Sequence, residues 1–211
     1  MNVTTKKLLF VHLTDVHGWV AGHSHNATLN ADFGDFVSLI EHLREDETRT
    51  VLVIDSGDII EGTGLSDVSE IDGQYIFPIF QQVPNFAALT IGNHGRIFKK
   101  IRLKKNHSIL PSDVGNAESL AFMENNFIPF FNNEKTNIHG RYLTSNSLDS
   151  TGKTIGNYYD VRDTSDGLKI LLLGFLYDFH YYAPDSTVVP VAASVNQVNQ
   201  CSFYFALLLS F

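Results

Sequence analysis

Five residues with metal-binding or proton-transfer side chains follow three apolar runs near the start of this 211-residue chain. Asp15 and His17 follow "KLLFVHLT", Asp58 follows "TVLVIDSG", and Asn93 and His94 follow "FAALTIG". Carboxylate, imidazole and amide donors suit Zn²⁺, Mn²⁺ or Fe, and one shared carboxylate could hold two such ions about 3.5–4 Å apart. A pair of ions activates water and clamps phosphoryl oxygens, so a phosphate ester is the expected substrate. A histidine left free beside such a site could protonate the leaving alkoxide.

Buried strands must position these side chains. The runs "KLLFVHLTD", "TVLVIDSGD" and "FAALTIGNH" each read as a buried strand that ends in polar residues. After Asp32, a plausible N-cap, apolar residues recur at helical spacing as far as Leu43, which predicts an amphipathic helix. Strands separated by helix-forming sequence predict a parallel α/β sheet, and ligands of such sheets bind outside the carboxyl ends of the strands.

A second sheet is expected further along the chain. The segments "NYYDVRD" and "GLKILLLGFLYD" flank the turn-forming "TSDG", which predicts a hairpin.

Composition excludes several classes of protein. A formal net charge of −8 argues against a nucleic-acid partner, because binding to the phosphate backbone needs clustered Lys and Arg. Cys201 is the single cysteine, so a metal here must use His, Asp and Asn. No apolar run reaches the roughly 20 residues of a membrane span. The segment after Lys7 reads as a strand rather than a signal peptide, so cytoplasmic is the default location. Oligomeric state stays open.

Four motifs resemble those of the calcineurin-like metallophosphoesterases, within the branch related to 5'-nucleotidases. They are "DVHGW" at 15–19, "DSGD" at 55–58, "GTGLSD" at 62–67 and "TIGNH" at 90–94. The resemblance covers about the first 95 residues, with a weaker echo in "GRYLTSNS" and "GLKILLLGFLYDF".

The resemblance implies a site, a fold and an activity. Asp15 and His17 would bind the first of two divalent ions, Asp58 would bridge both, Asn93 would bind the second, and His94 would be the catalytic histidine. The family fold is a four-layer α/β/β/α sandwich, expected here in incomplete form over residues 1–195. The implied activity is metal-dependent hydrolysis of small phosphomonoesters such as nucleotides. Complete members of this branch are often secreted or luminal.

The chain departs from the family pattern in its remaining ligands. The family's last ligands form a late Gly-His-x-His motif, whereas Gly22-His23-Ser24-His25 lies in the loop after the first strand. We expect that early motif to be a polar loop, and metal binding by it is the alternative. His180 is the only histidine after "GLKILLLGFLYDF", and it is not assigned a role. Gly95 follows Gly-Asn-His, where the family commonly has an acidic residue.

The C-terminal segment also differs from the rest of the chain. Residues 196–211 read as an apolar tail outside the domain, which should pack irregularly. The alternative function is therefore that of a truncated, non-catalytic relative with an incomplete metal site. On that ligand count, the chain should hold one ion or none and hydrolyse phosphate esters little or not at all.

Two further polar residues are expected to be structural. Asp55 should bond the neighbouring loop rather than a metal, and His12, within the first strand, should lie in the core or an interface.

Overall fold

The computed structural model describes residues 7–23, 25–67, 69–83, 85–93, 120–133, 141–164, 167–177, 186–195 and 204–210. Its centre is a parallel sheet with the strand order β1 (Lys7–Leu13), β2 (Arg49–Asp55), β3 (Phe86–Thr90) and β4 (Arg141–Leu143). The predicted parallel sheet is confirmed, and the first three predicted strands are its first three members.

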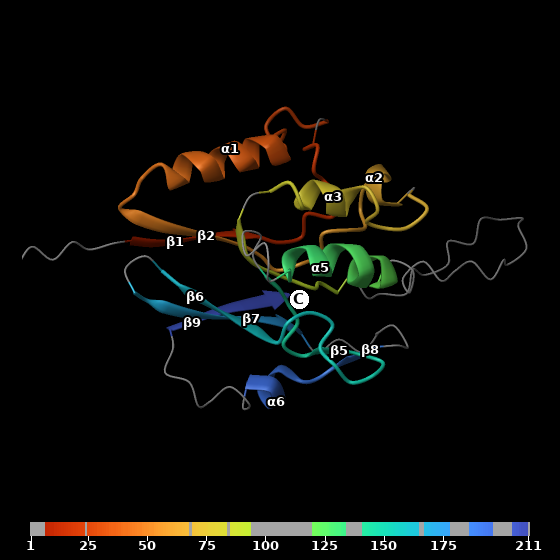
Figure 1. Ribbon diagram of the computed structural model, residues 1–211. Helices are drawn as coiled ribbons and strands as arrows, with labels where there is room; N and C mark the ends of the chain where they lie inside the picture. Colours follow the sequence, from red (N-terminus) through yellow and green to blue (C-terminus); the bar gives the residue numbers. More distant parts are fainter. Residues whose placement is uncertain are drawn as a thin grey trace, which may run out of the picture.

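Helices cover one face of this sheet (Figure 1). They are α1 (Phe33–Arg44), α2 (Gly64–Asp67), α3 (Ile76–Phe80), the π-helical turn η1 (Met123–Phe127) and α5 (Ile128–Phe131). Aromatic rings fill the space between helices and sheet, where Phe80, Phe86, Phe127 and Phe131 are fully buried. Burial of these large rings is the main apolar contribution that holds the helices against the strands.

A second sheet packs on the other face. It contains β6 (Tyr159–Asp163), β7 (Lys169–Leu176) and β9 (Tyr204–Ser210), and a two-stranded sheet pairs β5 (Ser147–Asp149) with β8 (Ser186–Val188). Ile170 and Leu172 of β7 face the first sheet, whereas Leu171 and Phe175 pack with α6 (Val191–Val195). The order of layers is thus helix, sheet, sheet, helix (Figure 1), which agrees with the expected α/β/β/α sandwich.

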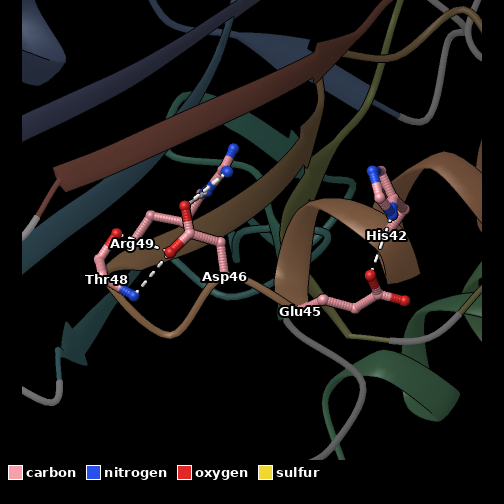
Figure 2. A network of polar contacts seen from close by, with 5 residues as sticks. All are labelled: His42, Glu45, Asp46, Thr48 and Arg49. Carbon is pink, nitrogen blue, oxygen red and sulfur yellow. Dashed lines mark hydrogen bonds and ion pairs between the residues drawn. The ribbon is translucent and has the colours of Figure 1, made fainter.

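Local hydrogen bonds fix both ends of α1. Asp32 and Asp35 form a capping box, in which each carboxylate accepts the backbone N–H of the other residue at 3.0–3.1 Å. After the helix, Asp46 accepts bonds from the Thr48 hydroxyl at 2.6 Å and from Arg49 Nε at 2.9 Å (Figure 2). These bonds, that of Thr48 above all, lower the pKa of Asp46 to about 2. The turn therefore leads directly into β2, at whose far end Asp58 lies.

The first strand is less buried than its apolar sequence predicts. Among the described residues β1 pairs only with β2, and Leu8 and Phe10 are 37% and 41% exposed. His12 is exposed too, and its Nε2 lies 2.9 Å from Ser56 Oγ. The expectation that His12 lies in the core is wrong, because this strand is at an edge of the described sheet.

The predicted hairpin strands are confirmed, since β6 and β7 pair antiparallel. Beyond them, the expectation of irregular packing is wrong for residues 204–210, which form β9 parallel to β7. The domain boundary at residue 195 stays a prediction. In the described part of the chain, no helix is long and apolar enough to cross a membrane.

Candidate metal centre

Asp15, His17 and Asp58 converge at the carboxyl ends of β1 and β2. One ligand atom from each lies within 4.8 Å of those of the other two. The two loops are joined by backbone bonds that continue beyond the strands: Asp15 N–H donates to Gly57 O at 3.1 Å, and His17 N–H donates to Asp58 O at 2.9 Å. The parallel pairing of β1 and β2 therefore explains why residues more than forty positions apart meet.

All three residues have left-handed backbone conformations. Their φ angles are +55° for Asp15, +48° for His17 and +55° for Asp58. A positive φ in a residue other than glycine costs about 1–2 kcal/mol, and such residues gather at sites where function requires a particular side-chain direction. The strain thus coincides with the group that the motifs single out.

The imidazole of His17 is oriented as in metal-binding histidines. Its Nδ1 lies 2.6 Å from the carbonyl oxygen of Glu61, and because a carbonyl only accepts, Nδ1 carries the hydrogen. In the neutral ring, Nε2 then has a free lone pair, and it faces Asp15 Oδ1 at 3.5 Å. Two such lone pairs repel unless a cation lies near both. Metal-binding histidines commonly donate their second nitrogen to a backbone carbonyl in this way. The donor set therefore fits a divalent ion.

The "GTGLSD" motif holds that carbonyl in place, a role that the sequence did not reveal. Glu61 N–H donates to Ser66 Oγ, and Gly62 N–H donates to Asp67 Oδ1, both at 2.9 Å. Residues of α2 thus fix the backbone that orients His17. The motif itself was the available signal, but nothing in its residue types indicated a bond to a histidine in another loop.

Glycines bring the end of β3 against Asp58. A Cβ on Gly92 would lie 2.1 Å from Asp58 Oδ1, and one on Gly57 would lie 2.4 Å from the Gly92 nitrogen. Asn93, half-buried, follows Gly92 directly, so its backbone adjoins the metal group. Its role as a ligand stays a prediction. His94 lies outside the described residues, as does His180, and the catalytic role of His94 likewise stays a prediction.

Gly92→Ala should damage this centre. The added methyl overlaps Asp58, so the loops must separate, and overpacking of this kind costs about 1–3 kcal/mol of unfolding free energy. We also expect weaker Mn²⁺ binding by calorimetry. Gly152→Ala is the control, because its site has positive φ but open space, so strain alone acts. Equal Mn²⁺ affinities for the two variants would contradict the proposed role of this close approach.

Asp55 lies beneath the centre and has the expected structural role. Its side chain is fully buried, and Oδ1 accepts the Gly57 N–H at 2.8 Å, which shapes the loop that carries Asp58. Burial raises the pKa of Asp55 to about 8, and the negative charges of Asp58 and Asp15 add to that effect. Without a cation nearby, the carboxyl is therefore protonated at neutral pH.

The raised pKa of Asp55 predicts a pH dependence of stability. The folded protein keeps this proton, whereas the unfolded chain loses it near pH 3.8, so its stabilising contribution is full below that pH and is lost as pH rises towards 8. Asp55→Asn removes this dependence. Denaturant unfolding in chelator should show the variant gaining unfolding free energy relative to the parent from pH 4 to 8. Parallel pH curves would show that Asp55 is already ionised.

His23 and His25 contact Trp19 instead of the metal group. The His23 ring stacks on the indole with centroids 3.9 Å apart, and the His25 ring lies 5.8 Å from it. Within the described residues, no group of three metal-binding side chains includes either histidine. The arrangement agrees with the expectation that Gly-His-Ser-His does not ligate the ion.

Comparison with known proteins identifies the family. A family model described as calcineurin-like phosphoesterase matches residues 8–194. The chain belongs to this family. The resemblance seen in the motifs is thereby confirmed, and the calcineurin-like domain extends well beyond the residues that carried it.

Relatives and solved structures agree with that assignment. An uncharacterized protein of Schizosaccharomyces pombe is 30% identical over 96% of this chain, and a protein of Arthroderma benhamiae named "Secreted protein" is 32% identical over 89%. The crystal structure of a 5'-nucleotidase from Candida albicans superposes with a TM-score of 0.75 at 26% identity over 99% of this chain. The chain spans only 32%, 26% and 37% of those three proteins, respectively.

Proposed function

We propose that this calcineurin-like domain carries the metal site of a phosphoester hydrolase that acts on phosphomonoesters, with nucleotides as the first candidates. The convergence of Asp15, His17 and Asp58 is the observation that carries the proposal. The similarity to a 5'-nucleotidase at 26% identity supports the choice of substrate class.

Each residue has a defined part in this proposal. Asp15 and His17 hold the first ion, Asp58 bridges to a second, Asn93 contributes to the second, and His94 protonates the leaving oxygen. Bound divalent ions supply an activated water and polarise the phosphoryl oxygens. The protein contributes orientation: the Glu61 carbonyl fixes the tautomer of His17, and the backbone bonds between loops fix Asp15 against Asp58.

The described residues group enough ligands for one ion, so we expect slow turnover or none by the 211-residue chain with Zn²⁺ or Mn²⁺. Binding of phosphate is therefore the sharper test. Inorganic phosphate and AMP should bind the Mn²⁺-loaded chain in calorimetry and should not bind it in chelator or as Asp58→Asn. Failure of phosphate to bind the loaded chain overturns the proposal.

Turnover distinguishes the alternative of a non-catalytic relative. Hydrolysis of p-nitrophenyl phosphate above the level of Asp58→Asn identifies an enzyme, whereas ion and phosphate binding without turnover identifies a metal-binding relative with an incomplete site. Strong turnover that is lost in His23→Ala would assign the early Gly-His-Ser-His motif to the site and contradict the ligand set above.

A further inference from the structure

A cleft opens beside the metal group, between the loop after β1 and helix α1. Its volume is about 410 Å³, within the roughly 300–1,000 Å³ of typical small-molecule sites. Eleven residues line it: Leu13, Asp15, Val16, Trp19, His23, Ala31, Asp32, Phe33, Asp35, Phe36 and Leu39. Asp15 belongs to both the cleft and the metal group, so the two are continuous.

The walls of the cleft are mainly apolar and aromatic. Trp19 is held by its stack on His23, and Phe36 contacts Phe33 with ring centroids 5.6 Å apart. Leu39 projects from α1 and is 50% exposed, although it lines a concave surface. Rigid aromatic walls with an exposed leucine at the rim favour an apolar ring as the occupant.

The charges of the cleft exclude a second anionic group. Asp15, Asp32 and Asp35 are among the lining residues, and no lysine or arginine is. Asp32 and Asp35 are there as the capping box of α1, but their negative charge acts on any ligand in the cleft. A phosphate therefore belongs at the metal group, and a ligand that extends into the cleft must carry its organic part there.

We infer that this cleft binds the apolar ring of a phosphomonoester whose phosphate is held at the Asp15–His17–Asp58 group. The inference rests on the proposed function, because the phosphate anchors the ligand. It narrows the substrate class to esters of ring-bearing alcohols without a further anionic group. Nucleoside di- and triphosphates are disfavoured, because their extra charge would meet the three carboxylates.

Trp19 makes the inference directly measurable, since it is the single tryptophan of the chain and lies in the wall of the cleft. The probes are phenyl phosphate and inorganic phosphate, titrated into the Mn²⁺-loaded chain by calorimetry while Trp19 emission is recorded. Phenyl phosphate should bind at least about 10-fold more tightly than inorganic phosphate, because its ring is removed from water. Only phenyl phosphate should shift the emission of Trp19.

Two leucine substitutions locate the effect. Leu39→Gln should reduce the preference for phenyl phosphate to less than about 3-fold and leave the affinity for inorganic phosphate unchanged. Leu168→Gln is the matched control, because Leu168 is 38% exposed and precedes β7 in the second sheet, so it should keep the full preference.

The outcomes separate this inference from the proposed function. Equal affinities for the two probes, or an unchanged Trp19 emission, overturn the inference and leave the metal-bound phosphate in place. Failure of both probes to bind the loaded chain overturns the proposed function and the inference with it.

Discussion

Asp58→Asn is expected to weaken Mn²⁺ binding by more than about 100-fold and, at the same time, to stabilise the metal-free protein. Loss of supporting residues around a metal typically costs 10–100-fold in affinity, and a direct ligand should cost more. Asp58 is only 4% exposed and lies close to the carboxyl groups of Asp15 and Asp55. Without an ion these charges repel, so the neutral amide relieves strain that the ion otherwise offsets.

The opposite signs make this prediction specific. Calorimetry measures the affinity, and thermal unfolding in chelator measures the stability of the metal-free chain. Asp163→Asn is the matched control, because Asp163 forms an exposed ion pair with Lys169 and should change neither quantity strongly. A variant of Asp58 that binds Mn²⁺ normally, or that loses stability in chelator, would refute its role as a strained ligand.

His17→Ala should also lower the affinity for Mn²⁺ by about 100-fold or more, whereas His23→Ala should change it less than about 2-fold. The two histidines are in one loop, but they differ in orientation. His17 directs Nε2 towards Asp15 while Nδ1 bonds the Glu61 carbonyl, and His23 stacks on Trp19. Calorimetry on both variants makes the comparison. Comparable losses in both would mean that the Gly-His-Ser-His motif takes part in the site.

The sequence predicted the elements that place the site because their patterns are local. Apolar runs with polar ends gave β1, β2 and β3, and helical spacing after Asp32 gave α1 with its N-cap. From these, parallel strand ends implied that Asp15, His17 and Asp58 would meet, as the structure shows.

What the sequence did not predict depends on contacts between distant segments. An all-apolar run reads as a central strand whether or not a neighbour covers it, so the exposure of His12 on β1 was missed. The positive φ of three non-glycine residues has no signature in their types. The pairing of β9 with β7 likewise arises from sheet geometry rather than from any period in its sequence.

Diffraction from crystals soaked in Mn²⁺, with anomalous difference maps, tests the central claim most directly. The account predicts a peak within about 2.0–2.2 Å of carboxylate oxygens of Asp15 and Asp58 and of His17 Nε2, and no such peak in crystals of Asp58→Asn. A peak bound by His23 and His25 instead, or none at saturating Mn²⁺, would contradict it.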